Sequence, residues 1–361
     1  MPTIYVIHPG SGIDVHSRYL QVFHKQQLCL GVPINRVTQI ILFGICNLSR
    51  QTQVLIATRR IPVHYINVHG DQLGSLELTP KRPFQYQNHQ LICSQDFEFM
   101  RAIAESIIWA KLHNEMIVLK QLQPEFDHCN IEKTINFLQL LADDLPSANS
   151  IEELWDYHAT ATSYYYPILA SLVPHWSNHH SSFRLDLSHP VLQMLKLGYT
   201  FLHQQMALFI NDLDLDPQIS NLHPLSQTNQ PLVDDLIEEF RPILVDSLVV
   251  KLLQTGAITA SDFVPPNGSR GGYLQPSALQ NFINHWEEKL ATHIEHPFAG
   301  TISYRQCFEL QVKEYIACLL GDVEFYQPLL MQKEKGKLKK MYAKEEYLTQ
   351  KNVVQVFSGK D

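Results

Sequence analysis

A histidine and several carboxylates lie close together in one stretch of the sequence, His223 to Pro242. Pro231 suits the first turn of a helix, where its missing N–H is not needed. In that helix Asp235 and Glu238 are three residues apart, so their carboxylates should neighbour each other. Carboxylate oxygens combined with an imidazole are ligands suited to Mg²⁺ or Mn²⁺. Such an ion neutralises charge on a phosphoryl group and activates the attacking oxygen, so this stretch is a candidate site for metal-dependent phosphoryl transfer.

The acidic residues of the same helix can also be explained without a catalytic or metal-binding role. Its apolar residues share one face at helical spacing, and the opposite face carries Asp234, Asp235, Glu238 and Glu239. Acidic residues near a helix start are favoured by the helix dipole, and such a face is usually solvated. A lone histidine such as His223 is also more often a surface or core residue than a ligand. The metal site therefore needs support from outside this stretch.

Other arrangements that could carry chemistry are weaker. His175, His179 and His180 are clustered, but no Cys or acidic partner follows at the spacing of a zinc site. Gly10 and Gly12 follow an expected strand with no helix after them, which argues against a phosphate-binding loop. Nothing in the chain resembles a GxSxG elbow or a Cys/His nucleophile pair.

The composition is that of an ordinary globular protein. The chain has 361 residues, of which 45% are hydrophobic and 18% charged, and a formal net charge of −8. Because no basic excess is available to neutralise phosphates, any DNA surface must be a local patch. The six cysteines form no CxxC pair, and neither a signal peptide nor a membrane-length apolar run is present. We therefore expect a reduced, cytoplasmic protein with no membrane contact.

The elements that must position the candidate site fall into two differently built parts. Residues Thr3 to Glu77 predict short strands, with one helix at Gln51–Arg59. From Asp96 onward, apolar residues recur at helical spacing. The expected fold class is α+β, with a small N-terminal β-rich, β-sandwich-like domain followed by a larger all-α domain. The expected bounds are a β domain at 1–82, a linker at 83–97, a helical domain at 98–330 and a lysine-rich tail at 331–361.

Further helices are expected along the second part. They are Ile131–Leu141, Ile151–Leu172, Val191–Ile210, Leu232–Leu253, Pro276–Ile294 and Tyr304–Leu320.

Segments around the candidate site resemble the signature of a known family. Asp216-Pro217 leads to Leu222-His223, and Leu232–Pro242 follows with Val245-Asp246. They resemble the "DP…GFLH" and "LALDLMEEFRP" motifs of the CRISPR-associated endonuclease/integrase family Cas-one. The resemblance implies a catalytic set of His223, Asp235 and Glu238, with His223 binding a metal ion.

The resemblance extends over roughly residues 3 to 330. Thr3–Ser11 resembles the opening strand of the family, Val32–Gly44 its "VPL…IVLFG" segment, and Glu105–Lys111 with Asn114 its "AxxIVxAKIxNQ" segment. It implies a β domain that forms a homodimer, a catalytic helical domain, and the small protein Cas-two as partner. The implied substrates are double-stranded and branched DNA. In the implied reaction, the 3′-OH of a prespacer attacks a phosphodiester at the edge of a CRISPR repeat, assisted by Mg²⁺ or Mn²⁺.

One departure from the family pattern falls in the site itself. The third metal ligand of the family is a Glu in "LmGxEGxxAxxYF", and in Leu154–Tyr166 this position is His158. The implied metal ligands are then His158, His223 and Glu238. Imidazole ligates Mn²⁺ but lacks the charged, hard oxygen that Mg²⁺ prefers. The chain is either a working integrase with a shifted or Mn²⁺-preferring site, or a degenerate paralogue that binds DNA as a non-catalytic scaffold.

Positive charge for DNA binding must come from individual side chains. The candidates are Lys111, Arg184, Arg241 and Arg270, together with the lysine-rich tail, which is either solvated or an arm that binds phosphates. If these residues converge on one surface, DNA binding should weaken steeply with salt.

Overall fold

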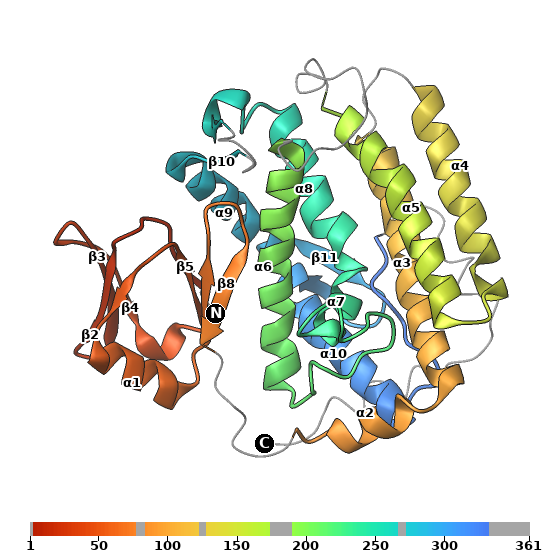
Figure 1. Cartoon of the computed structure of the whole chain (residues 1–361), viewed down its shortest axis with the longest axis horizontal. Coiled ribbons are helices and arrows are strands. Elements are labelled where there is room, and N and C mark those ends of the chain that lie inside the picture. Colours follow the sequence, from red (N-terminus) through yellow and green to blue (C-terminus); the bar gives the residue numbers. More distant parts are fainter. Residues whose placement is uncertain (1–2, 77–83, 123–127, 174–189, 266–271, 332–361) are drawn as a thin grey trace.

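Most strands gather at one end of the protein and most helices at the other (Figure 1). A computed structural model describes residues 3–76, 84–122, 128–173, 190–265 and 272–331. Residues 3–76 form two four-stranded sheets, and nearly all of the helices follow them in the chain. The expected α+β fold class is confirmed.

The sheet nearer the helices is built around a fully buried strand. Its order is β1 (Thr3–Val6), β5 (Gln39–Phe43), β7 (Val63–Ile66) and β8 (Gln72–Leu76), and all pairs are parallel except β7 with β8. Every residue of β5 is buried, as its apolar, β-branched composition favours for a central strand. Ile41 and Phe43 pack into the helical core, whereas Ile40 and Leu42 face the second sheet.

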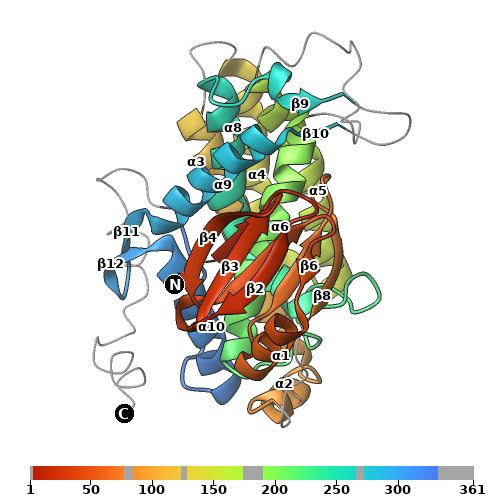
Figure 2. The same ribbon diagram turned by 90° about the vertical axis from the view of Figure 1, so that its left-hand side faces the viewer.

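The second sheet lies on the outer side of the first (Figure 2). Its order is β4 (Gln27–Pro33), β3 (Tyr19–His24), β2 (Gly12–His16) and β6 (Asn47–Leu48). The helix α1 (Arg50–Arg59) begins after Ser49, whose hydroxyl accepts the N–H of Thr52, as expected of an N-cap serine. The fully buried side chains of Leu20 and Ile56 help to fill the small core between the sheets and α1.

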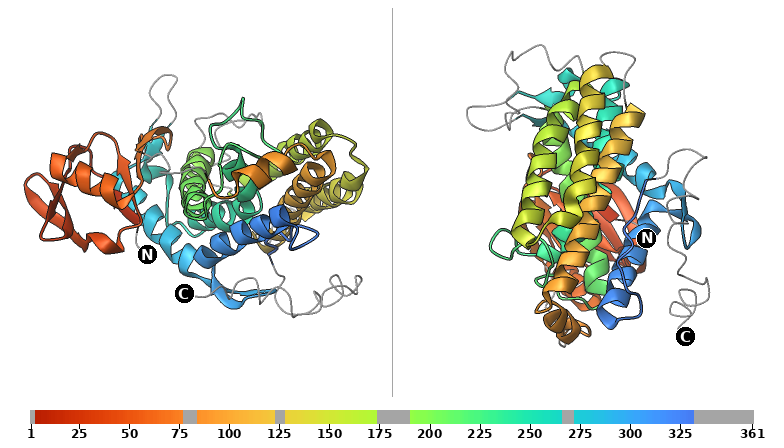
Figure 3. Two further views of the ribbon diagram at one scale, coloured as in Figure 1. Left: turned by 90° about the horizontal axis from the view of Figure 1, so that it is seen from below. Right: turned by 90° about the vertical axis from the view of Figure 1, so that its right-hand side faces the viewer.

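The helical part consists of long and short helices, and the long ones pack side by side (Figure 3). They are α2 (Gln87–Cys93), α3 (Phe97–Leu122), α4 (His128–Asp144), α5 (Ile151–Ser171), α6 (Pro190–Asp212), α7 (Pro231–Ile237), α8 (Ser247–Gln254), α9 (Pro276–Ala291) and α10 (Tyr304–Leu320). Short 3₁₀ turns occur at Ile34–Arg36, Leu145–Ser147 and Ala260–Asp262. Two hairpins, β9–β10 (Phe263–Val264, Tyr273–Leu274) and β11–β12 (His293–His296, Gly300–Ser303), mean that this part is not purely helical.

The segment 83–97, expected as a linker, contains the helix α2. The buried amide of Gln90 donates to the backbone oxygen of Asp216 at 3.0 Å and accepts the N–H of Asp216 at 2.8 Å. This reciprocal pair fixes the start of the loop that leads to His223.

The helix expected from Leu232 to Leu253 is interrupted. α7 ends at Ile237, and a π-helical turn, η4 (Arg241–Asp246), leads into α8. Pro242 lacks an N–H and cannot complete the ordinary hydrogen-bond ladder, which accounts for the interruption. Turns of this kind are frequent at functional sites.

Aromatic and ionic contacts fix the first sheet on the helices. Phe43 of β5 meets Phe201 of α6 edge to face, with 6.1 Å between ring centroids. Tyr5 of β1 donates to Glu287 at 2.8 Å, and Arg305 binds the same carboxylate at 2.6 Å. Within the described residues, no helix is long and apolar enough to cross a membrane.

Candidate active site

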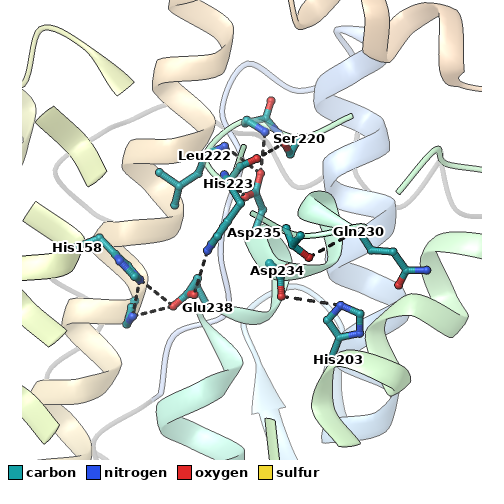
Figure 4. Close-up of polar contacts among 12 residues, drawn as sticks. His158, His203, Ser220, Leu222, His223, Gln230, Asp234, Asp235 and Glu238 are labelled. Atoms are coloured by element: carbon teal, nitrogen blue, oxygen red, sulfur yellow. Dashed lines mark hydrogen bonds and ion pairs between the residues drawn. The ribbon is translucent and has the colours of Figure 1, made fainter. Parts of the chain in front are cut away.

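Side chains from three helices and one loop meet at a buried point in the helical part (Figure 4). Lys111 comes from α3, His158 from α5, Glu238 from the end of α7, and His223 from the loop before α7. His158 and His223 are each 8% exposed, and Glu238 is 0% exposed. The packing of α3 against α5 and α7 brings these residues together from distant parts of the sequence.

Asp235 holds His223 in one orientation. Its Oδ2 accepts the backbone N–H groups of Asn221 at 2.7 Å and Leu222 at 3.1 Å, and its Oδ1 accepts that of His223 at 2.9 Å. The Nδ1 atom of the His223 ring lies 2.9 Å from the same Oδ1. Because this carboxylate acts as the acceptor, Nδ1 carries the proton, and in the neutral ring Nε2 keeps its lone pair. That Nε2 atom is 3.8 Å from Oε1 of Glu238.

The buried ammonium group of Lys111 bridges His158 and Glu238. Its Nζ lies 2.6 Å from His158 Nε2 and 2.8 Å from Glu238 Oε2. Since an ammonium group only donates, the Nε2 atom of His158 accepts and also carries a lone pair. Burial, reinforced by the charge of Lys111, lowers the pKa of His158 to about 4, so the ring is neutral at neutral pH. Trp155, one turn earlier on α5, stacks on the His158 ring at 4.8 Å.

Glu238 is the negative centre of the site. Besides Lys111, it binds Arg241, whose Nη1 is 2.7 Å from Oε1. Burial alone would raise the pKa of this carboxyl group, but the charges of Arg241 and Lys111 outweigh burial and hold the pKa well below its usual range. Glu238 is therefore ionised, and its charge is compensated by two cations.

The two imidazoles and the Glu238 carboxylate face one small space. Nε2 of His158 is 3.3 Å from Oε2 of Glu238, and Nε2 of His223 is 3.8 Å from Oε1. Among the residues that the structure describes, no three His, Cys, Asp or Glu side chains already stand in metal-binding geometry. The Lys111 ammonium instead lies between His158 and Glu238. Two imidazoles and one carboxylate suit Mn²⁺ better than Mg²⁺, so the donor set fits a divalent ion once the ammonium moves away.

The acidic side of α7 is buried, so the alternative of a solvated face is wrong. Asp235, Glu238 and Glu239 are all 0% exposed, and Asp234 is half-buried. Glu239 accepts hydrogen bonds from the Tyr326 hydroxyl at 3.0 Å and the Leu329 N–H at 2.7 Å. Helix periodicity separated these residues from the apolar face but could not show that α3, α6 and the chain after α10 cover them.

The expected DNA-binding residues have different outcomes. Lys111 is 1% exposed and bound to His158 and Glu238, so the expectation that it contacts DNA is wrong for this structure. Arg241 is partly exposed, and its guanidinium lies over the Tyr199 ring at 5.1 Å from the centroid. Arg184, Arg270, the lysine-rich tail and the cluster of His175, His179 and His180 lie outside the described residues.

Two further buried carboxylates near the site were not assigned from the sequence. Asp246 accepts hydrogen bonds from the hydroxyls of Tyr165 at 3.0 Å and Tyr199 at 2.5 Å. Glu115, one turn after Lys111 on α3, is 0% exposed, and neither of its oxygens has a hydrogen-bond partner among the described residues. Burial raises the pKa of Glu115 to about 8 although the charge of Lys111 opposes this. In the sequence, the closeness of Glu115 to Lys111 was indicated by their spacing of four residues on one helix.

A pocket of about 810 Å³ opens beside the buried site. Its lining includes Lys196 and Tyr199 of α6, Asp234 of α7, and Arg241. Because Arg241 also binds Glu238, one side chain connects this pocket with the buried imidazoles and carboxylates.

The fold and the site together define an α+β protein whose helical part encloses two imidazoles and a group of carboxylates. Residues 4–288 match the family described as CRISPR associated protein Cas1. The chain belongs to this family, and the resemblance inferred from its sequence motifs is confirmed.

Three curated relatives span nearly the same length. The chain is 23% identical to a CRISPR-associated endonuclease Cas1 of Methanospirillum hungatei, covering 91% of each chain. It is 24% identical to one of Thermus thermophilus, covering 90% of this chain and 96% of the relative. It is 26% identical to a CRISPR-associated endonuclease Cas1 of Clostridium perfringens, covering 83% of this chain and 90% of the relative.

Solved structures share the fold. A CAS1 protein of Thermotoga maritima superposes with a TM-score of 0.75 at 19% identity, covering 92% of this chain and 100% of that one. A casposase bound to integration product gives 0.77 at 20% identity, covering 95% and 98%. A chain of a Cas6-RT-Cas1–Cas2 complex gives a TM-score of 0.78 at 18% identity. The superposition covers 93% of this chain but 36% of that longer chain.

Proposed function

We propose that the protein is an integrase and endonuclease of CRISPR adaptation, which joins a short prespacer duplex to a CRISPR repeat. The observation that carries this proposal is the meeting of His158, His223 and Glu238 in one buried site of a Cas1-family fold, with His223 oriented by Asp235. Curated relatives of similar length are named Cas1 endonucleases, and a casposase of the same fold is bound to an integration product.

In the proposed reaction the 3′-OH oxygen of the prespacer forms a bond to a phosphorus of the repeat. The bond from that phosphorus to the 3′ oxygen of the repeat strand breaks, and the leaving oxygen takes up a proton as the attacking hydroxyl loses one. With water as the attacking group, the same displacement is hydrolysis, which accounts for nuclease activity. His158, His223 and Glu238 would hold a divalent ion, better Mn²⁺ than Mg²⁺, and such an ion would supply positive charge that stabilises the phosphoryl group.

The residues of the chain have separate tasks in this proposal. Asp235 fixes the ring of His223 so that Nε2 faces the reacting groups. Arg241 lies between Glu238 and the pocket, where its remaining N–H groups can bind a phosphate oxygen. Trp155 covers one face of His158 and helps to exclude water.

The proposed partners are double-stranded and branched DNA, Cas2, and a second copy of the chain. Support for Cas2 comes from the fold shared with a chain of a Cas6-RT-Cas1–Cas2 complex. For the β domain as dimer interface, support comes from β4, an edge strand with Leu28 56% and Leu30 39% exposed. Edge strands with apolar side chains are suited to pairing with another chain.

A strand-transfer assay tests the proposal. Purified full-length protein would be mixed with a labelled short duplex and a repeat-containing target, with Mg²⁺ or Mn²⁺, with and without Cas2. We expect transfer by the wild type that His223→Ala reduces at least 100-fold. No transfer by the wild type under any condition, together with transfer by His158→Glu, would show instead a scaffold protein that kept the fold and lost its chemistry.

A further inference from the structure

Lys111 lies where a divalent ion would have to bind. Its ammonium group is 2.6 Å from His158 Nε2 and 2.8 Å from Glu238 Oε2, two of the three proposed ligand atoms. The side chain is 2% exposed, so it cannot move into solvent without opening the core. A divalent ion and an ammonium group cannot share the same ligand atoms, because both are cations and both use the same lone pairs.

Of the two cations on Glu238, Lys111 is the one suited to move. Arg241 binds Oε1 alone, and its planar group is held over the Tyr199 ring. Lys111 has a flexible stem and a compact charge, and besides His158 and Glu238 its ammonium contacts the Thr162 hydroxyl at 3.5 Å. It therefore needs a second anionic partner inside the protein.

Most buried carboxylates around the site already have their hydrogen bonds. Asp235 accepts three backbone N–H groups and the His223 ring. Asp246 accepts two tyrosine hydroxyls, and Glu239 accepts Tyr326 and Leu329. Glu115 differs from all of these, because it is 0% exposed and neither oxygen has a hydrogen-bond partner in the described part of the chain. Buried carboxyl groups without a protein partner are rare, so Glu115 is the buried acid near the site that is available to take a new partner.

Glu115 is also in reach of Lys111. The two residues are four positions apart on α3 and so share one face of that helix. The charge that most strongly favours an ionised Glu115 is that of Lys111. The ammonium stays with Glu238 while no ion competes, because Glu238 is ionised whereas burial raises the pKa of Glu115 to about 8 and keeps it protonated at neutral pH.

We propose that Lys111 and Glu115 form an exchangeable ion pair that opens the metal site. When a divalent ion binds between His158, His223 and Glu238, the ammonium group of Lys111 leaves these ligands, the Glu115 carboxyl group releases its proton to solvent, and the ammonium pairs with the resulting carboxylate. Lys111 and Glu115 are thus positioning residues that set the affinity for the ion. This inference rests on the proposed function, because it uses the same metal ligands.

The test is a titration of the full-length protein with Mn²⁺ alone, followed by the loss of the electron paramagnetic resonance signal of free Mn²⁺. We expect Glu115→Gln to weaken binding about tenfold or more, because the ammonium loses its second partner. Lys111→Met should bind Mn²⁺ at least as tightly as the wild type, and adding Glu115→Gln to it should change the affinity less than twofold. Glu239→Gln, the same change at a buried carboxylate bonded to Tyr326 and Leu329, is the matched control and should bind like the wild type.

Two results would overturn the inference. One is an unchanged affinity in Glu115→Gln, and the other is an equal loss in the presence and absence of Lys111, which would mean that the Glu115 charge acts on the ion directly. A structure of the Mn²⁺ complex of the wild type is an independent readout that needs no variant to fold. It should place Lys111 Nζ within hydrogen-bond distance of Glu115, and an ammonium still bound to Glu238 would contradict the inference.

The proposed function fails in a different way from this inference. If wild-type protein binds no Mn²⁺, or if His223→Ala binds it equally well, the proposed metal site itself is wrong. Binding that depends on His223 but not on Glu115 overturns the ion-pair exchange alone.

Discussion

The Nδ1 atom of His223 lies 2.9 Å from Oδ1 of Asp235, and the same oxygen accepts the backbone N–H of His223. Asp235 therefore fixes both the backbone and the ring of one residue. The loop that carries His223 has little regular structure of its own. The carboxylate of Asp235 on α7 therefore fixes the position of this loop and of the His223 ring, as a helix would for a residue within it.

Replacing Asp235 by Asn should damage this arrangement in two ways. The amide oxygen can satisfy only some of the four donors, and the amide nitrogen would face the others. We expect a loss of about 2–4 kcal/mol in the free energy of unfolding and a fall of at least about 100-fold in strand transfer. Urea unfolding and the strand-transfer assay measure the two effects. Asp234→Asn, the same change at the preceding, half-buried residue, should cost less than about 1 kcal/mol, and an equal cost would argue against a special role for Asp235.

His158→Glu should change which ion the protein prefers. A second carboxylate among the ligands replaces an imidazole with a charged, hard oxygen, which Mg²⁺ favours. The ratio of Mg²⁺ to Mn²⁺ affinity should rise at least about tenfold, as measured by competition of Mg²⁺ against bound Mn²⁺. His113→Glu, at a histidine of α3 that stacks on Trp109 rather than at this site, is the control and should leave the ratio unchanged. The same ratio in His158→Glu and wild type would show that residue 158 is not a ligand.

Two adjacent tyrosines should respond differently to loss of their hydroxyls. Tyr165 is 0% exposed and donates to Asp246, whereas Tyr164 is 50% exposed. Tyr165→Phe removes one of the two hydroxyls that bind a buried carboxylate, and should destabilise the protein by about 1–3 kcal/mol. Tyr164→Phe should stay within about 0.5 kcal/mol. Thermal and urea unfolding of both variants measure the difference in stability. Equal stabilities would mean that the hydrogen bond from Tyr165 to Asp246 does not stabilise the fold.

Close packing of α6 on the π-helical turn predicts that Gly198 cannot carry a side chain. A Cβ at Gly198 would lie 2.5 Å from Cγ1 of Val245, closer than carbon atoms approach. We expect Gly198→Ala to cost about 1–3 kcal/mol in urea unfolding, and Val245→Ala to recover much of this in the double variant. Gly74→Ala meets no atom within 4 Å and serves as control. A Gly198→Ala protein as stable as the wild type would disprove this contact.

Stability should fall as the pH rises from about 5 to 8, partly because of Glu239. Burial raises the pKa of Glu239 to about 8, although the Leu329 N–H and the Tyr326 hydroxyl oppose the rise. Between the ordinary pKa of a glutamate and this raised value, the folded state holds a proton that the unfolded state releases, so higher pH favours unfolding. Glu239→Gln removes this titration, and its stability relative to the wild type should increase by about 1–3 kcal/mol from pH 5 to pH 8.

The measurement is urea unfolding of both proteins across that pH range. Glu309→Gln changes a partly exposed glutamate that pairs with Lys313, and its pH dependence should parallel that of the wild type. Parallel curves for Glu239→Gln and the wild type would contradict the prediction.

Much of the fold follows from local patterns in the sequence. Short β-prone runs predicted the strands of residues 3–76, and helical spacing predicted α10 at its observed bounds, Tyr304–Leu320. The helix start at Pro231 was also local, because it depends on the backbone hydrogen bonds of one turn. For the same reason, the sequence placed Asp235 and Glu238 side by side on one helix.

Only the tertiary structure decided what these residues do. Periodicity separates two faces of α7, but whether the acidic face is solvated depends on α3 and α6, which come from other parts of the chain. A lysine in a helix is ordinarily a surface charge, and Lys111 is buried because His158 and Glu238 meet it from α5 and α7. The unpaired Glu115 is likewise a property of the packed core, since a lone carboxylate in a sequence does not show how many donors will surround it. Local interactions fix the elements, whereas burial and charge pairing arise only when elements distant in the chain come into contact.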